Sequence, residues 1–470
     1  MKLKRKAVEI LSSDIFGNDK LQRKESITNL VELLKNISSP VVFSVNAPWG
    51  AGKTTYLRML HSSLQLENRK SIYFSAWETD FAEDPLVAFL GEMNTSITDF
   101  IGKNTKKIKA WENAKKAGVQ IVKRTVPVAV KLATAGIIDA DKFFEDEASK
   151  LAEQLSKDVI GSYEINKKAI VEFKDNLAKI LADDAGEDEG SQKLYIFVDE
   201  LDRCRPTYAI ELLERIKHLL DIEGLVFVLA LDKTQLAHSV KAIYGAEFDA
   251  SGYLKRFIDV EFSLPSSDVN LYIDYLADQF EFSSFFKGGR SRDAEFQLPN
   301  LLSAIKYIAR GQEMSLRTIE QLFAKIKLAL LSVPKGSYAF PEIMVFLLFV
   351  KENFPAVFSN FIRIDSGGDE LIDLIDKVVV GDDGDEVRFF KLDVHALIIA
   401  CKLRVNEGWS KAYIKNMKEV AGLGTTSEKD SYNIRHVLNL VDHYTSMGRI
   451  VPLDRIVSQI NMASSFKFDS

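Results

Sequence analysis

Residues 41–54 read Val41-Val42-Phe43-Ser44-Val45-Asn46-Ala47-Pro48-Trp49-Gly50-Ala51-Gly52-Lys53-Thr54. The first six form an apolar run of strand type, and a turn rich in small residues follows them. A helical pattern begins near Lys53 and ends near Leu66, and another helical pattern precedes the strand over residues 27–37. A strand, a glycine-rich turn and a helix in this order predict the first βα unit of an α/β fold.

The turn and the start of its helix match the P-loop pattern, with Ala47 in place of the first glycine. Small residues let backbone N–H groups point into a concave nest around phosphates, and the helix N-terminus adds partial positive charge. We expect Lys53 to reach the β- and γ-phosphates and the Thr54 hydroxyl to ligate Mg²⁺. The expected nucleotide-binding residues are Ala47, Pro48, Trp49, Gly50, Ala51, Gly52, Lys53, Thr54 and Thr55.

Further apolar runs of strand length alternate with helical patterns, at residues 71–77, 194–198, 225–231 and 259–264. Continuous apolar strands that alternate with helices predict a parallel sheet covered on both faces. After Pro265 the pattern is helical to the end of the chain. The expected fold class is α/β, a P-loop core followed by an all-α region.

The run at residues 194–198 leads into Asp199-Glu200-Leu201-Asp202-Arg203-Cys204. Two acids therefore follow a strand at the carboxyl edge, where ligands of open α/β sheets bind. This is a Walker B arrangement, in which we expect Asp199 to hold Mg²⁺ through its water shell and Glu200 to orient and polarise an attacking water. The alternative interpretation, two surface acids before a helix, loses most of its weight beside the P-loop.

Three more residues are candidates for catalysis, and for each of them an ordinary structural role is at least as well supported. Asp232 follows the run at residues 225–231, where either a γ-phosphate sensor or a helix N-cap fits. Arg256, expected on a helix just before the fifth strand, is a candidate arginine finger acting in trans or a solvated basic helix end. Arg317 opens a helix of the all-α region, as a second sensor that folds over the nucleotide or as a surface arginine.

Composition limits the class of protein. The 470 residues include 61 Lys and Arg against 67 Asp and Glu, a net charge of -6, which argues against a surface built to coat nucleic acid. Cys204 and Cys401 lie far apart, and neither they nor the histidines show metal-ligand spacing, so we expect no metal beyond Mg²⁺. No long apolar segment follows the basic N-terminus, and a cytoplasmic protein is expected.

Residues 101–190 are too many for a simple crossover and predict a helical insertion. Residues 103–131 carry nine Lys and Arg against one acid, Glu112, which fits contacts with nucleic-acid phosphates or a solvated, partner-facing helix. The apolar residues 125–138 are too few and too charged to span a membrane, so membrane binding is not expected. The expected domains are a core of 15–100 and 191–265, the insertion, a helical lid at 266–335 and a C-terminal helical domain at 336–470.

Four segments together resemble the KAP family of P-loop NTPases, which is related to the AAA+ and STAND branches. They are Pro48–Thr54, Phe74–Trp77, Val198–Cys204 and Tyr253–Ile258. Ser75 stands where that family has Asn in a Phe-Asn-Ala-Trp-like signature, and Glu200 stands where it commonly has a second Asp. The resemblance covers residues 15–330 and implies an ATPase core with a small helical lid. Many members carry two transmembrane helices between the Walker motifs, and several bacterial relatives look like components of phage-defence systems.

The functional prediction is Mg-dependent ATP binding and hydrolysis, used as a conformational or assembly switch. One alternative is a nucleotide-gated scaffold that recruits an effector with little turnover, and another is a nucleic-acid motor. ATP is expected rather than GTP because an Asn-Lys-x-Asp signature is missing from the fourth and fifth strands. Expected partners are further copies of the chain or proteins of the same system. Arg23 and Glu25 precede the first strand, where a surface face is the simpler expectation and a position close to the base is the alternative.

Overall fold

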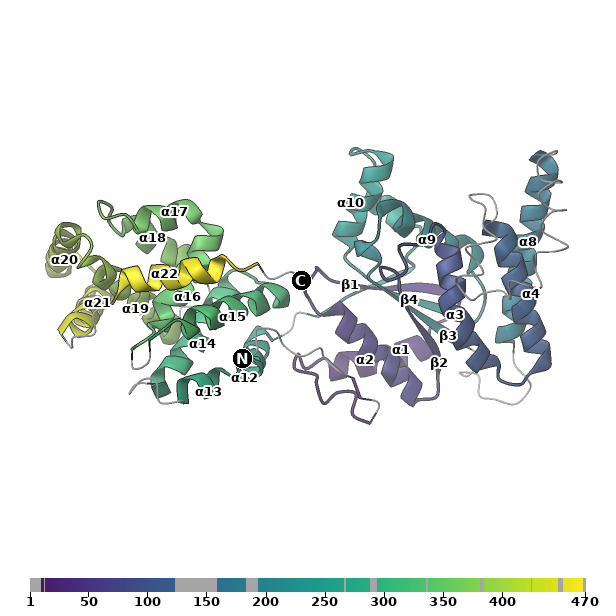
Figure 1. Cartoon of the computed structure of the whole chain (residues 1–470), viewed down its shortest axis with the longest axis horizontal. Coiled ribbons are helices and arrows are strands. Elements are labelled where there is room, and N and C mark those ends of the chain that lie inside the picture. The colour runs from purple at the N-terminus through teal and green to yellow at the C-terminus, as the bar shows by residue number, and fades with distance from the viewer. Residues whose placement is uncertain are drawn as a thin grey trace. The chain divides into compact units, whose positions relative to one another are not determined.

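The computed structural model describes residues 10–11, 13–122, 159–182, 193–265, 268–287, 294–334, 337–380, 384–423, 425–446 and 451–467. The chain divides into two compact units, one of residues 8–266 and one that contains residues 267–470. Each unit has its own set of elements (Figure 1).

The first unit is built on a five-stranded sheet with the order β2-β3-β4-β1-β5. Its strands are β1 (Val41–Asn46), β2 (Lys70–Ser75), β3 (Leu194–Asp199), β4 (Leu225–Leu231) and β5 (Val260–Ser263). All four neighbouring pairs are parallel. The central strands β3 and β4 are buried along their whole length, whereas the edge strands β2 and β5 are partly exposed. The predicted parallel sheet is therefore confirmed, and its carboxyl edge gathers the ends of all five strands.

Helices cover both faces of this sheet. Alternate residues of β3 point to opposite faces, so Tyr195 and Phe197 pack with α1 and α2, while Ile196 and Val198 pack with α3, α9 and α10. The helices of this unit are α1 (Lys24–Asn36), α2 (Lys53–Leu66), α3 (Pro85–Ile101), α4 (Thr105–Val122), α8 (Val159–Leu181), η1 (Leu201–Arg203), α9 (Pro206–Leu219), α10 (Lys233–Tyr244) and α11 (Ala250–Leu254). The expected covering of both faces is what the structure shows.

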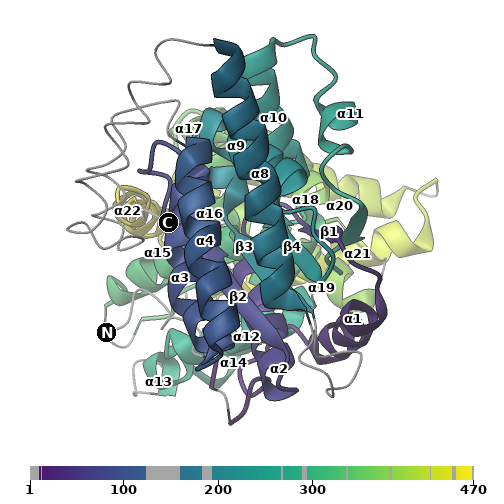
Figure 2. The ribbon, with the colours of Figure 1, turned by 90° about the vertical axis from the view of Figure 1, so that its right-hand side faces the viewer.

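The segment between β2 and β3 contributes α4 and α8, which pack against each other beside α3 (Figure 2). Of the basic stretch 103–131, residues 103–122 are described, while 123–131 and the apolar stretch 125–138 lie outside the described residues. Lys103, Lys106 and Lys109 are exposed. Trp111 is 3% exposed, and its indole N–H donates to Asn94 Oδ1 at 2.9 Å. This aromatic ring therefore belongs to the core.

In the described residues of the second unit, the regular elements are helices joined by loops. Its helices are α12 (Val269–Gln279), α13 (Phe282–Lys287), α14 (Ala294–Gly311), α15 (Leu316–Leu331), α16 (Pro341–Asn353), α17 (Pro355–Phe361), α18 (Asp369–Val378), α19 (Asp385–Lys402), α20 (Glu407–Gly422), α21 (Glu428–Ser446) and α22 (Leu453–Ser464). The helix α16 is buried along residues 341–350 and packs against α14, α15, α17, α19 and α22. Helices from both sides of residue 335 thus share one compact unit, and the proposed border between a lid and a C-terminal domain stays a prediction. Within the described part of the chain, we find no helix with the length and apolar character that a membrane crossing requires.

One local expectation was wrong. Arg256 was expected on a helix, but α11 ends at Leu254 and Arg256 lies in the turn that leads to β5. The N–H groups of Arg256 and Phe257 donate to the carbonyls of Tyr253 and Leu254, three residues back, at 3.0 and 3.1 Å. These shorter bonds tighten the end of the helix and turn the chain toward the strand.

Candidate functional site

The loop between β1 and α2 forms the base of the site. Gly50 has φ of 81° and Gly52 has φ of 84°, a left-handed conformation that residues with a Cβ atom adopt only at a cost. The N–H of Ala47 donates to the carbonyl of Leu231 at 3.2 Å, which fixes the start of the loop to the end of β4. The loop therefore turns its backbone tightly enough for α2 to begin directly at Lys53.

Lys53 is held inside this loop. Its ammonium donates to the carbonyl oxygens of Ala47 at 2.7 Å and Pro48 at 3.3 Å, and it lies 3.8 Å from Asp202 Oδ2. Burial lowers the pKa of Lys53, and the nearby carboxylates of Asp202, Asp232 and Asp199 oppose that shift. A partly desolvated cation thus faces acids that follow β3 and β4 at one edge of the sheet.

Asp199 is the last residue of β3 and is 2% exposed. Its Oδ1 accepts the N–H of Glu200 at 2.9 Å, and its Oδ2 accepts the hydroxyl of Tyr73, on β2, at 2.5 Å. Burial, and then the charge of Asp199, raise the pKa of Tyr73, so the phenol keeps its proton. Both oxygens of Asp199 are consequently fixed in direction.

Glu200 has φ of 62°, and this left-handed turn directs the chain from β3 into η1. Its Oε1 pairs with Arg203 Nη1 at 2.7 Å, and its Oε2 accepts the hydroxyl of Ser75 at 3.3 Å. The guanidinium of Arg203 lies 5.9 Å from the ring centroid of Trp77. The carboxylate of Glu200 is thus oriented by side chains from η1 and from the end of β2.

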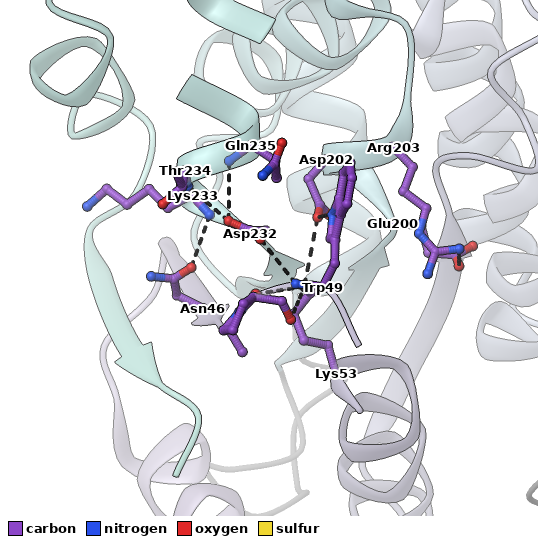
Figure 3. A network of polar contacts seen from close by, with 12 residues as sticks. Asn46, Trp49, Lys53, Glu200, Asp202, Arg203, Asp232, Lys233, Thr234 and Gln235 are labelled. Carbon is purple, nitrogen blue, oxygen red and sulfur yellow. Dashed lines mark hydrogen bonds and ion pairs between the residues drawn. The ribbon is translucent and has the colours of Figure 1, made fainter. Parts of the chain in front are cut away.

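Asp232 joins the loop to the end of β4 (Figure 3). Its Oδ1 accepts the N–H groups of Thr234 and Gln235 at 3.1 and 3.2 Å, which makes it the N-cap of α10. Its Oδ2 accepts the N–H of Trp49 at 3.1 Å. The N-cap interpretation is what the structure shows, and a role as a γ-phosphate sensor stays a proposal.

The remaining predicted residues are distributed differently. Thr54 and Thr55 lie in the first turn of α2, half-buried at the loop. Arg256 is exposed before the amino end of β5, whereas the loop follows the carboxyl end of β1. Arg317 is the second residue of α15 and belongs to the helical unit, whereas Lys53 belongs to the P-loop unit.

Two residues make contacts with the loop that were not predicted from the sequence. Arg23, for which a surface position was the simpler expectation, is 5% exposed and donates to the carbonyls of Ala51 at 2.8 Å and Gly52 at 3.3 Å. Asp202 is 6% exposed and accepts the indole N–H of Trp49 at 2.5 Å. The position of Asp202 just after the Walker B acids was a signal in the sequence, but spacing alone does not show that its partner is Trp49.

Several solved structures resemble the chain. They include Cdc6p from Pyrobaculum aerophilum (12% identity, 94% of each chain covered, TM-score 0.31) and the Aeropyrum pernix ORC2 protein in ADPNP-ADP complexes (12%, 94% of each, 0.30). A third is Drosophila ORC bound to poly(dA/dT) DNA and Cdc6 (10%, 93% of this chain and 72% of that chain, 0.28). These scores are too low to transfer a role to any residue. No curated protein sequence matches the chain significantly.

A family model described as the KAP family P-loop domain matches residues 23–332. The match is more than half of the chain and contains the glycine-rich loop, the acids after β3 and both candidate arginines. The chain therefore belongs to the KAP family of P-loop NTPases.

Proposed function

We propose that this chain binds Mg-ATP and hydrolyses it, and that the change of nucleotide state works as a conformational or assembly switch. The observation that carries the proposal is the position of Lys53, whose ammonium lies in the loop 3.8 Å from Asp202 and within electrostatic reach of Asp199. Membership of a P-loop NTPase family supports nucleotide binding at this loop.

The loop fits a triphosphate. The positive φ angles of Gly50 and Gly52 turn the backbone around the start of a 14-residue helix, whose first N–H groups attract anions. Lys53 adds an ammonium that is already desolvated and held near the loop. We assign the phosphates to this loop, with Lys53 at the β- and γ-phosphates.

The donor set also fits Mg²⁺, which prefers hard oxygen ligands. We assign the ion to the hydroxyl of Thr54 and, through water, to Asp199. Each oxygen of Asp199 accepts one hydrogen bond from the protein and keeps further acceptor capacity. When bound, the ion would neutralise part of the phosphate charge.

Glu200 is the residue that we assign to water activation. A carboxylate there can accept a hydrogen bond from water and aim its lone pair at the γ-phosphorus. The Ser75 hydroxyl lies 3.3 Å from one oxygen of this carboxylate, and the Arg203 guanidinium lies 2.7 Å from the other. These two contacts fix the plane of the carboxylate. Lys53 would stabilise the charge that develops on the phosphate oxygens.

The test is steady-state ATP hydrolysis by the full chain with Mg²⁺. We expect Lys53→Ala to lose nucleotide binding and turnover together. Glu200→Gln keeps the shape of the side chain, so it should bind ATP normally while turnover falls by roughly 10²–10³-fold. Tight binding by the wild type with no turnover above the Glu200→Gln level would contradict the hydrolysis proposal.

We propose further that Arg256 completes the site of a second copy. It is exposed on the side of β5 opposite to its own loop, and four residues of strand span about 13 Å. Turnover per chain should therefore rise with protein concentration and should fall in Arg256→Ala. Arg317 is the alternative from the lid, and Arg317→Ala should reduce turnover without changing its concentration dependence.

A nucleotide-gated scaffold is the second candidate, because both carboxylate oxygens of Glu200 are engaged by protein side chains. Equal and very low turnover in the wild type and Glu200→Gln would favour it. The motor alternative has less support, since Trp111 is buried and cannot stack on bases. DNA added to the same assay tests contacts through residues 103–131. Phage defence and a cytoplasmic location stay predictions from the resemblance and the composition.

A further inference from the structure

Asp202 is a buried acid that the hydrolysis scheme does not use. It is 6% exposed, and one of its oxygens, Oδ2, faces two donors, the indole N–H of Trp49 at 2.5 Å and the ammonium of Lys53 at 3.8 Å. Figure 3 shows the Trp49 ring standing beside Asp202, with Lys53 below it. A buried carboxylate is costly unless it is compensated: burial raises the pKa of Asp202, and Lys53, the indole of Trp49 and backbone N–H groups oppose that shift.

Trp49 is bound at two points. Its backbone N–H donates to Asp232 and its indole N–H to Asp202, so residues that follow β4 and β3 both hold it. The side chain is nevertheless 45% exposed. A large ring on the surface of the loop is thus oriented through its only polar atom, and losing that bond would leave the ring free to move.

Lys53 has three N–H donors, of which two are directed to the carbonyls of Ala47 and Pro48. On its remaining side, Asp202 lies within ion-pair distance but beyond hydrogen-bond distance. A phosphate that binds Lys53 through the remaining donor brings negative charge close to Asp202. Because like charges repel most strongly where solvent is excluded, Asp202 and the phosphate compete for one cation.

We propose that Asp202 is a positioning residue that competes with nucleotide phosphate for Lys53, and that phosphate binding leaves Asp202 held more tightly by the indole of Trp49. The inference rests on the proposed nucleotide site and adds a signal on its surface. Trp49 then reports whether the loop holds a triphosphate.

The test combines calorimetric titration of the full chain with Mg²⁺ and ADPNP and tryptophan fluorescence in the same samples. Asp202→Asn keeps an oxygen for the indole N–H but removes the charge, so it should bind ADPNP about tenfold more tightly. Trp49→Phe removes the indole donor, so that Lys53 is the remaining one of these two partners of Asp202. This variant should bind ADPNP more weakly. A merely structural role would weaken binding in both variants.

Fluorescence gives the second readout. ADPNP should change the wild-type emission and lower its quenching by acrylamide, because the ring is held more tightly, and Trp49→Phe should lose that response. Trp77→Phe is the matched control, since Trp77 is 52% exposed near Arg203 but is not bound to Asp202, and it should keep the response. Should Asp202→Asn fail to fold, the fluorescence comparison still decides.

The outcomes separate the two proposals. No heat of binding in the wild type would overturn the nucleotide site itself. Binding in the wild type with a response that survives Trp49→Phe, or with weaker binding in Asp202→Asn, would overturn the competition alone.

Discussion

The Arg23 guanidinium supports the phosphate-binding loop from behind. It donates to the carbonyl oxygens of Ala51 and Gly52, which point away from the side that the loop's N–H groups must face. Burial lowers the pKa of Arg23 to about 10, so the group stays charged at neutral pH. A charged donor on these carbonyls fixes the loop and adds positive potential near the phosphates.

We expect Arg23→Met to lower the free energy of unfolding by about 2 kcal/mol, because two half-buried carbonyls lose their charged donor. The affinity for ATP should fall by roughly tenfold as the loop loosens. Arg23→Lys keeps the charge but not the planar guanidinium, so its stability and its affinity for ATP should lie between those of the wild type and Arg23→Met. Urea unfolding and calorimetric titration measure these effects.

Lys24→Met is the control, because Lys24 is the next residue along the chain and is exposed. It should change stability by less than about 0.5 kcal/mol. Unchanged ATP affinity in Arg23→Met would show that the loop keeps its shape without this support.

At the scale of elements, α10 and the phosphate-binding loop share one acid. Asp232 uses Oδ1 to cap α10 and Oδ2 to accept the N–H of Trp49. An asparagine has only one acceptor oxygen, so at this position it can cap the helix but cannot also accept from Trp49. Replacing one carboxylate oxygen of Asp232 with the amide nitrogen of asparagine therefore separates the capping of α10 from the contact with Trp49.

The free energy of unfolding of Asp232→Asn should lie within about 0.5 kcal/mol of the wild-type value. That of Asp232→Ala should be about 1 kcal/mol lower, because alanine cannot cap the helix. Both variants should bind ATP several-fold more weakly, because both lose the bond to Trp49. Thermal unfolding and ATP titration measure the two effects. Asp249→Asn changes the N-cap of α11 in the same way, away from the loop, and should bind ATP normally. Normal affinity in Asp232→Asn would mean that the contact to Trp49 does not shape the loop.

The sequence was most informative where one element decides the outcome alone. β1, α2 and β4 begin and end at the expected residues, because continuous apolar runs and a glycine-rich turn specify them locally. The loop and the acids after β3 were predictable for the same reason. Arg23 and Asp202 were not, since their partners lie 28 and 153 residues away and meet them only after the sheet has formed. The early end of α11 was missed because periodicity places helix ends poorly.

At the scale of the whole molecule, the two units differ in what their buried acids do. In the P-loop unit, Asp199, Asp202 and Asp232 surround a lysine. In the helical unit, Glu342 of α16 is buried, and the half-buried carboxyl group of Asp393 of α19 lies close enough to raise the cost of ionising it. Asn300 donates to Glu342, and Tyr444 donates to Asp393 at 2.5 Å. Asn300 and Tyr444 are neutral donors, so they satisfy the hydrogen bonding of these carboxyl oxygens but do not compensate the negative charges of two carboxylates.

Burial, and then the charge of Asp393, raise the pKa of Glu342 above its ordinary value of 4.5. A raised pKa means that the folded unit holds a proton that the unfolded chain releases, so stability is lost as pH rises above 4.5 toward neutral and alkaline values. We expect local opening of α16 and α19 to become easier by on the order of 1–2 kcal/mol between pH 5 and pH 8. Hydrogen exchange of peptides from these helices, corrected for the intrinsic effect of pH, measures it in the full chain.

Glu342→Gln removes the larger cause, because glutamine can still accept from Asn300 but cannot ionise, while burial still raises the pKa of Asp393 to about 6. It should slow exchange in α16 and α19 at pH 8 and reduce the dependence on pH to the part that Asp393 contributes, while peptides from β1 and β4 in the other unit stay unchanged. Glu370→Gln, which alters an exposed acid bound to Asn360 in the same unit, should leave the dependence as in the wild type. A dependence as large in Glu342→Gln as in the wild type would assign it to groups other than Glu342. A change that spreads to β1 and β4 would show that the two compact units do not open independently.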